Sequence, residues 1–158
     1  MNGKIAVGGI TRKDGLVLVR ILGARSGQGQ TGRTLSALGL QRININCVTA
    51  ASDEHGRSDI CFAIGKNDLD QALGILQSLQ DDLQARTIDY QRRCSSISVY
   101  GPHFSERPAI AGTIFDITAE AGVRIHLIST SFSTVSFLTD EDQAVIAVER
   151  LRQSFLVP

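Results

Sequence analysis

The chain has 158 residues, of which 42% are hydrophobic and 20% are charged, so it has room for one ordinary domain or two small ones. Sixteen basic residues balance sixteen acidic ones without a long run of like charge, which argues against a nucleic-acid-binding surface. No apolar run approaches the roughly 20 residues that span a bilayer, and the N-terminus lacks the pattern of a signal peptide. The three cysteines form no CxxC pair, and their odd number suggests free thiols in the cytoplasm.

The first half of the sequence predicts the element order strand, helix, strand, strand, helix, strand. Its first strand is an apolar stretch that stops at Gly23, and its second and third strands form a hairpin whose turn is supplied by Gly56. Leucines at helical spacing give the second helix an apolar face, with Asn67 as the N-cap. The predicted elements are Leu16–Leu22, Thr31–Gly39, Ile43–Ala51, Arg57–Ile64, Asn67–Leu83 and Arg86–Gln91.

The second half repeats much of this order. Gly32–Ala51 aligns without a gap with Gly112–Ser131, an offset of 80 residues. Pro108 is well placed for the first turn of a helix that runs to about Ala121. The other predicted elements of this half are Ser95–Tyr100, Arg124–Ser131, Thr134–Leu138 and Asp140–Phe155.

The two halves differ in their closing strands. The second copy ends with its helix and lacks a closing strand, whereas Lys4–Gly9 precedes the first copy and has no partner there. Because an unpaired strand leaves backbone groups unsatisfied, we expect the N-terminal strand to close the second unit. The first unit, residues 13–92, is then inserted in the second, residues 1–12 plus 93–158. Helices are expected on one face of largely antiparallel sheets, which is an α/β fold of the α+β sandwich type.

The glycine-rich loop Gly23–Thr34 supports three interpretations. Gly27–Gly32 reads GxGxxG, and Gly27–Thr34 differs from a Walker A sequence at Arg33, so one alternative is a nucleotide-binding enzyme. Against it, the phosphate-contacting lysine is missing and the next two strands form an antiparallel hairpin. A second alternative is that the glycines merely let the chain turn. The favoured interpretation is that backbone N–H groups at a helix N-terminus bind an anionic carboxylate.

Catalytic and metal-binding patterns are not evident elsewhere. The three histidines are not spaced to share a metal, and the serines do not lie beside an obvious base, so we expect no catalytic residue, no metal and no cofactor. Cys47 and Cys61 are equidistant from a turn at residue 54, which predicts that they face each other across the hairpin. Packing is the favoured role for them, and a redox role is the alternative.

Two segments carry a family resemblance. Ile45–Ile64 (INCVTAASDEHGRSDICFAI) and Ser96–Ser131 (SISVYGPHFSERPAIAGTIFDITAEAGVRIHLISTS) resemble the paired ACT domains of aspartokinases and of their separately made regulatory subunits. The resemblance covers nearly the whole chain and implies two βαββαβ ACT-type units side by side, of ferredoxin-like fold. In that family the module is non-catalytic, binds lysine, threonine or a related end product at the junction of the units, and transmits occupancy to a kinase domain. These 158 residues leave no space for a kinase domain, and Met1 at the module boundary favours a complete product.

The resemblance also implies a site. The family binds its effector with the loop before the first helix and the start of the second strand, each facing the other unit. Family aspartates fall at Ser26 and Asn46, a family glutamine falls at Ala50, and a family asparagine falls at Arg124. Loss of the carboxylates makes lysine a poor candidate and favours a neutral or acidic amino acid. The candidate effector-binding residues are Ser26, Gly27, Gln28, Gly29, Gln30, Thr31, Asn46, Ala109, Ile110, Arg124, Ile125 and Ser131.

The sequence therefore predicts a non-catalytic regulatory module that binds an amino acid or similar small metabolite. We expect it to act as a homodimer or with a partner enzyme of amino-acid biosynthesis, and not with a nucleic acid or a membrane. One alternative is a structural dimerisation module whose effector site has decayed. Another is the regulatory part of an aspartate kinase.

Overall fold

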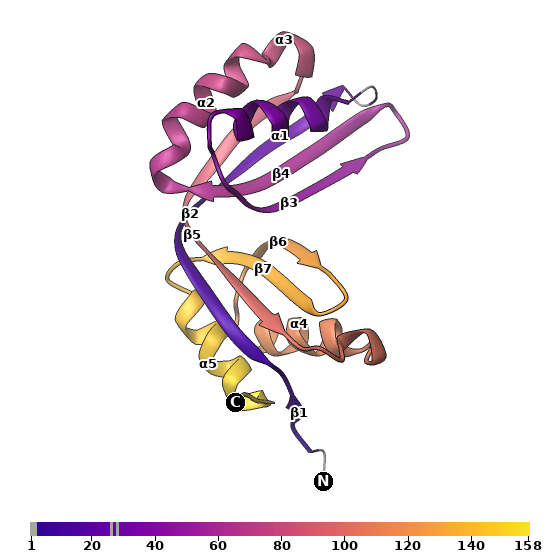
Figure 1. Ribbon diagram of the computed structural model, residues 1–158, viewed down its shortest axis with the longest axis vertical. Helices are drawn as coiled ribbons and strands as arrows, with labels where there is room; N and C mark the ends of the chain where they lie inside the picture. The colour runs from indigo at the N-terminus through magenta and orange to yellow at the C-terminus, as the bar shows by residue number, and fades with distance from the viewer. Residues whose placement is uncertain (1–2, 26, 28) are drawn as a thin grey trace. The chain divides into compact units, whose positions relative to one another are not determined.

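The computed structural model describes residues 3–25, 27 and 29–158. The chain divides into two compact units. Unit 1 combines the N-terminal segment up to Asp14 with Arg93–Pro158, and unit 2 is Gly15–Arg92. Two long strands, β2 (Gly9–Arg25) and β5 (Thr87–Tyr100), contribute residues to both units (Figure 1). Within the described ranges, no helix is long and apolar enough to cross a membrane.

Unit 2 has the strand order β3-β4-β2-β5, in which β4 is antiparallel to both β3 and β2. Its helices lie on one face of the sheet (Figure 1), where they cover alternate side chains such as Val19 of β2 and Phe62 of β4. Both of these side chains are fully buried, so this face is the core of the unit. The remaining elements are β3 (Ile45–Ser52), β4 (Arg57–Gly65), α1 (Gln30–Leu40), a 3-10 turn η1 (Lys66–Asp68), α2 (Leu69–Ser78) and α3 (Gln80–Leu83).

Unit 1 repeats this plan with β5, β7 and β6 in antiparallel order. Its two longer helices pack on one sheet face, where Phe137 of β7 is almost completely buried. The ring of Phe137 meets that of Phe115 edge to face, with 6.1 Å between centroids. The elements are a 3-10 turn η2 (Phe104–Glu106), α4 (Ile110–Glu120), β6 (Ile125–Thr130), β7 (Thr134–Asp140) and α5 (Ala144–Ser154).

The two ends of the chain meet in unit 1. The short strand β1 (Ile5–Ala6) lies parallel to β8 (Phe155–Leu156), with Ile5 opposite Phe155. The N–H of Val7 extends the pairing by donating to the carbonyl of Leu156 at 2.9 Å. The strand that precedes the first copy therefore pairs with the end of the second copy. The predicted fold class, α/β with helices and largely antiparallel sheets, is confirmed.

Several predicted boundaries were wrong. The two strands expected at residues 86–91 and 95–100 are the single strand β5, since no glycine or proline interrupts it. The helix expected at residues 67–83 breaks at Leu79, and Asp68 rather than Asn67 occupies the N-cap position. Helix α4 begins at Ile110, so Pro108 precedes the helix and does not lie in its first turn.

The expected pairing of Cys47 with Cys61 was also wrong. Cys47 lies opposite Ala63, and Cys61 lies opposite Thr49. The hairpin is centred on His55, because Ser52 pairs with Ser58 around a loop that ends at Gly56 with a φ of 72°. Burial is the main cause of a raised pKa at the Cys61 thiol, which favours packing over redox chemistry there.

Candidate functional site

The glycine-rich loop joins β2 to α1 at one end of unit 2. Gly27 and Gly29 adopt positive φ angles of 106° and 86°, a conformation that side chains disfavour. Gly29 is the N-cap of α1, and no side-chain hydrogen bond of the described residues caps the helix. The first turn of a helix carries backbone N–H groups without partners inside the helix, and in α1 this turn adjoins the loop. Ser26 and Gln28 lie outside the described residues.

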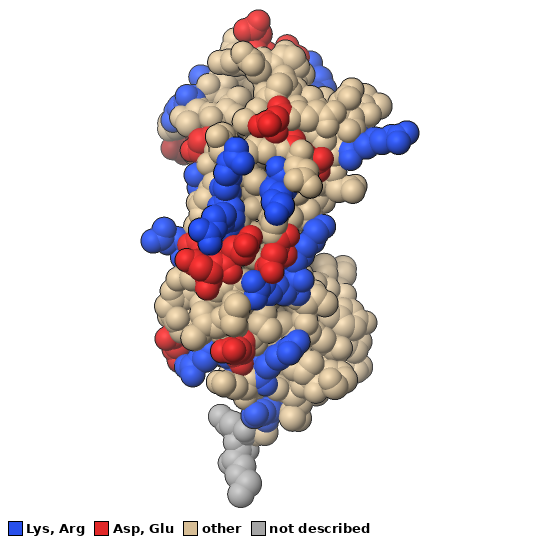
Figure 2. Space-filling model, turned by 90° about the vertical axis from the view of Figure 1, so that its left-hand side faces the viewer, with Lys and Arg blue, Asp and Glu red and all other residues tan. Residues whose placement is uncertain are grey.

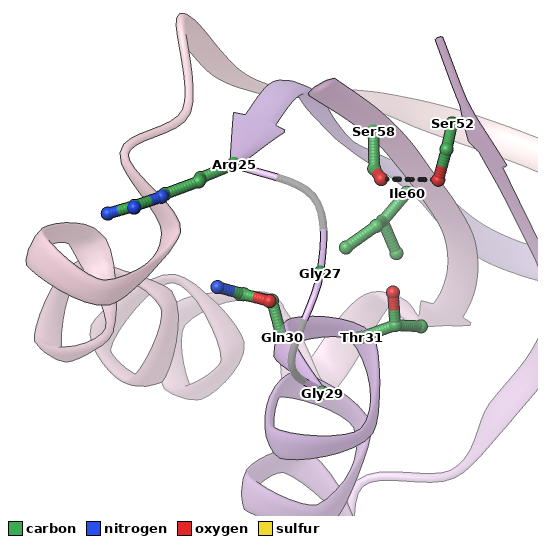
Figure 3. A pocket seen from close by; sticks show the side chains of 8 residues that line it. All are labelled: Arg25, Gly27, Gly29, Gln30, Thr31, Ser52, Ser58 and Ile60. Atoms are coloured by element: carbon green, nitrogen blue, oxygen red, sulfur yellow. Dashed lines mark hydrogen bonds between the residues drawn. The ribbon is translucent and has the colours of Figure 1, made fainter. Parts of the chain in front are cut away.

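A cavity of about 310 Å³ opens between this loop and the end of the β3–β4 hairpin. The hydroxyl groups of Ser52 and Ser58, which are paired across the two strands, lie 2.9 Å apart on its wall (Figure 3). Arg25 extends from the end of β2 away from this hydroxyl pair (Figure 3). None of the described lining residues is acidic, and the lining consists of Arg25, Gly27, Gly29, Gln30, Thr31, Ser52, Ser58 and Ile60.

The Gln30 side chain contributes to the lining of the cavity. Its side-chain oxygen Oε1 is buried and has no hydrogen-bond partner among the described residues. An unsatisfied buried polar group costs about 1–3 kcal/mol, so this position favours the arrival of a donor group. Figure 3 places the Gln30 side chain between those of Arg25 and Thr31, at the first residue of α1. A ligand ammonium or hydroxyl group that reached this oxygen would remove the cost.

A second cavity of about 420 Å³ adjoins the first and shares Arg25, Gly27 and Gln30 with it. Unlike the first, it has two carboxylates in its lining, those of Asp81 and Asp82. The Asp82 carboxylate lies 3.6 Å from the Arg33 guanidinium, and both side chains are more than half exposed. Such an exposed pair contributes little to stability. The second cavity is therefore more polar than the first, and its lining includes both basic and acidic side chains.

The hairpin tip beside the first cavity is ordered by Asp53. Its carboxylate accepts the backbone N–H groups of Arg57 at 2.9 Å and of His55 at 2.8 Å. These hydrogen bonds hold the pKa of the Asp53 carboxyl below its usual value, and the bond from Arg57 has the larger effect. The turn thus fixes the ends of β3 and β4, which carry the two serines of the cavity wall.

Nucleotide chemistry finds little support in this geometry. Strands β2 and β3, which flank α1 in the sequence, are separated by β4, and β4 is antiparallel to both. Strands β2 and β3 are therefore parallel to each other but not adjacent, whereas the dinucleotide-binding loop belongs to an open, mostly parallel sheet. Acidic and basic side chains are interspersed on the molecular face shown in Figure 2. Over the described part of the chain, no three His, Cys, Asp or Glu side chains gather as metal ligands do.

The structure brings some of the predicted site residues together and not others. Gly27, Gly29, Gln30 and Thr31 share the first cavity. Asn46 is an exposed residue of β3 and is not among the described residues that line it. Sequence analysis missed the four other lining residues. One of them, Arg25, is part of the glycine-rich loop segment itself, whereas the other three lie on β3 and β4, which the fold brings to the loop. Those four are Arg25, Ser52, Ser58 and Ile60.

The predicted residues of unit 1 have mainly structural surroundings. Ile110 is 5% exposed and belongs to the hydrophobic core, against which Ile125 also packs. The backbone N–H of Arg124 donates to the Gln143 side chain at 2.8 Å, while its own side chain is exposed. Two further candidates are exposed: Ala109 at the N-cap of α4, and Ser131, whose hydroxyl accepts the N–H groups of Ser133 and Thr134 in the β6–β7 turn.

Two glycines of this region are expected to respond oppositely to alanine. Gly29→Ala should destabilise the protein by about 1–2 kcal/mol, because an L-residue pays this steric penalty at a φ of 86°. Gly32→Ala, inside α1, should stabilise it by about 0.5–1 kcal/mol through helix propensity. Apart from the adjoining backbone, no heavy atom of the described residues lies within 4 Å of the added methyl group at either position, so such clashes do not obscure the comparison. Urea unfolding measures both values, and equal signs would contradict the expectation.

Comparison with known proteins agrees with the architecture. The sequence model of the ACT domain family matches residues 97–155. Aspartokinase 2 of Bacillus subtilis (strain 168) is 29% identical over 157 residues, a match that covers 98% of this chain and 38% of that protein. An aspartokinase of Bacillus sp. (strain MGA3) is 24% identical over 155 residues, with the same coverage of each chain. The chain thus spans about two fifths of the length of these relatives.

Solved structures extend the comparison to the whole fold. A chain in the crystal structure of aspartokinase alpha and beta subunits superposes with a TM-score of 0.85 and 28% identity, covering 94% of this chain and 98% of that one. The ligand-free regulatory subunit of aspartate kinase from Thermus thermophilus superposes with a TM-score of 0.86, covering 96% and 99% of the two chains. At 19% identity, the second match shows a common fold alone. The resemblance drawn from the sequence is therefore confirmed: the ACT-domain family model matches residues 97–155, and nearly the whole chain is similar to part of the aspartokinases and has the fold of an aspartate kinase regulatory subunit.

Proposed function

We propose that this chain is a non-catalytic regulatory module that binds a free amino acid on the glycine-rich loop of unit 2. The observation that carries the proposal is the cavity of about 310 Å³ beside the N-terminus of α1. Backbone N–H groups of the first helical turn suit an α-carboxylate, and the buried Oε1 of Gln30 suits an α-ammonium group. A helix N-terminus, an orphaned acceptor and a small polar cavity together fit the zwitterion common to all amino acids.

The lining of the cavity favours a neutral or acidic side chain on the ligand. Arg25 is the charged residue among its described lining, and the hydroxyl groups of Thr31, Ser52 and Ser58 supply uncharged polar partners. A ligand ammonium on the side chain would be desolvated there without a carboxylate to pair with it. L-Threonine and L-aspartate are therefore suitable test ligands, and L-lysine is the comparison. The predicted contribution of Arg124 and its neighbours in unit 1 stays a prediction.

Ligand binding should be visible as thermal stabilisation. We expect L-threonine or L-aspartate at millimolar concentration to raise the apparent unfolding temperature and L-lysine to leave it unchanged. A ligand that binds only the folded chain adds about 2.7 kcal/mol of stability at a concentration of about 100 Kd. The measurement is differential scanning fluorimetry, followed by calorimetric titration of whichever amino acid gives a shift.

A matched pair of serine variants tests the location. Ser58→Ala removes a hydroxyl group from the cavity wall and should weaken or abolish the ligand-induced shift. Ser136→Ala removes one member of a different cross-strand serine pair, in unit 1, where the hydroxyl groups of Ser98 and Ser136 lie 2.7 Å apart, and should retain the shift. Stabilisation by lysine alone would contradict the preferred ligand class. If none of the common amino acids stabilised the chain, the structural dimerisation alternative would be favoured.

The proposed regulatory output is a change in how the module associates with itself or with an enzyme. A ligand that prefers one conformation shifts the population toward it, by no more than its difference in affinity for the two states. In allosteric proteins this difference is typically about 1–3 kcal/mol. The expected partner is a second copy of the chain or an enzyme of amino-acid biosynthesis, and cytoplasmic location is part of the same proposal.

A further inference from the structure

Arg57, the first residue of β4, joins two segments that are far apart in the sequence. Its Nη1 atom donates to the carbonyl of Gly23 at 3.1 Å and to the carbonyl of Gln84 at 2.9 Å. Its backbone N–H is held by Asp53 at the hairpin tip, and the side chain is partly buried. Arg57 is not among the described residues that line either cavity. Its side chain therefore makes structural contacts near the proposed ligand site without contributing to the cavity wall.

Gly23 lies near the end of β2, which continues to Arg25 before the rest of the glycine-rich effector loop (Gly23–Thr34) begins. The register between β2 and β4 shifts between Ile21 and Ala24, so Gly23 lies at an irregularity and has a φ of 63°. Side chains of β4 bind both of its backbone polar groups, because Asp59 accepts its N–H at 2.7 Å and Arg57 donates to its carbonyl. Two side chains of β4 thus hold Gly23 at the irregularity, after which the pairing of β2 with β4 resumes at Ala24 and Arg25.

Gln84 ends α3 and is also in an unusual backbone conformation. Its φ of 44° is left-handed, which costs a residue other than glycine free energy unless the surroundings hold it in place. The Arg57 bond to its carbonyl supplies one such restraint. Two residues later, the N–H of Arg86 donates to the carbonyl of Leu22, which neighbours Gly23. The turn before β5 and the start of the effector loop are therefore bound to each other directly and through Arg57.

We propose that Arg57 is a positioning residue that couples the effector loop to the turn between α3 and β5. The inference rests on the proposed function for its regulatory meaning, because ligand on the loop would then restrain the start of β5 through this side chain. Its structural part concerns the ligand-free protein and can be tested separately. Arg57→Met keeps most of the aliphatic stem and removes both hydrogen bonds. Arg57→Lys keeps a single nitrogen that can donate to both carbonyls, because both bonds leave the same atom of the arginine.

The experiment is hydrogen–deuterium exchange of the ligand-free full chain. We expect Arg57→Met to accelerate exchange in peptides covering residues 23–34 and 84–88 together by about tenfold, the effect of losing hydrogen bonds to a charged group. Arg57→Lys should recover part of this protection in both segments. Arg150→Met, at an exposed position of α5, is the control and should change neither. If Arg57→Met does not fold, Arg57→Gln replaces it in the experiment, because the glutamine side chain is two bonds shorter than that of arginine.

The outcomes separate this inference from the proposed function. Unchanged exchange in Arg57→Met, acceleration in one segment alone, or no recovery with lysine would overturn the positioning role, whatever the chain binds. Coupled acceleration without stabilisation by L-threonine or L-aspartate would support the positioning role and count against the proposed ligand. When a ligand binds the wild type, its affinity should fall about tenfold in Arg57→Met, with partial recovery in Arg57→Lys.

Discussion

Replacing Gly101 with alanine is expected to destabilise the protein by about 3 kcal/mol, although the change adds one methyl group. The new Cβ would lie 2.0 Å from Cε1 and 2.4 Å from Cδ1 of Phe104, far inside van der Waals contact. Phe104 is 6% exposed and belongs to the core of unit 1, so its ring has to leave its place. The expected cost lies between the roughly 1–3 kcal/mol of overpacking and the roughly 3–5 kcal/mol of losing a buried phenylalanine.

A double-mutant cycle identifies the cause of this loss. Phe104→Ala alone should cost about 3–5 kcal/mol, and adding Gly101→Ala to it should cost little more, because the clashing ring is gone. Gly112→Ala is the matched control, since it adds a methyl group in α4 of the same unit with nothing within 4 Å. Chemical denaturation gives all of the values. Additive losses from the two substitutions would show that the ring is not the obstacle.

Phe104 also explains why the two halves of the repeat differ at their loops. In unit 2 the loop before α1 leaves a cavity that is lined by glycine backbone and hydroxyl groups. In unit 1 the segment before α4 forms the short helix η2, which places Phe104 in the core against Gly101. A single aromatic residue thus fills space on the loop of one unit, whereas the other unit keeps its loop small and polar.

The repeat and the order of the elements could be predicted because they depend on local patterns. Helix α1, predicted at Thr31–Gly39 directly after the glycine-rich loop, was placed to within one residue at each end. The break at Leu79 was not predicted, because leucines continue the same spacing through it and local sequence gives no signal. The predicted register of the hairpin depended on the residue at which the turn is centred. The prediction used residue 54 instead of residue 55, and this error of one residue placed Cys61 opposite Cys47 instead of opposite Thr49.

The candidate site was predictable in the loop and not beyond it. Glycines before a helix signal an N-terminus that can meet an anion, and Gly27, Gly29, Gln30 and Thr31 do line the cavity. Ser52 and Ser58 flank the hairpin turn and carry no signal of their own, because serine is common in turns for other reasons. The contacts of Arg57 could not be predicted from the sequence either, because only the folded chain brings the two carbonyl groups within reach of its side chain.

The pairing of β1 with β8 has an energetic consequence at Phe155. This side chain is 2% exposed in the core of unit 1 and lies opposite Ile5, so Phe155→Ala should cost about 3–5 kcal/mol. Leu156 follows it in the same two-residue strand but is 55% exposed, and Leu156→Ala should change stability by no more than about 0.5 kcal/mol. Urea denaturation of the two variants measures this contrast between neighbouring residues.

The same substitution tests whether the N-terminal strand is part of the unit 1 core. Val7 is 5% exposed and belongs to the same cluster as Phe155, while its N–H donates to the carbonyl of Leu156. Residues that share a core cluster lose stability non-additively, so Val7→Ala should cost measurably less in the Phe155→Ala background than in the wild type. Independent losses, or equal small losses for Phe155→Ala and Leu156→Ala, would mean that the first strand does not close the core. A coupling of about 0.5 kcal/mol or more between Val7 and Phe155 is the result that their shared packing requires.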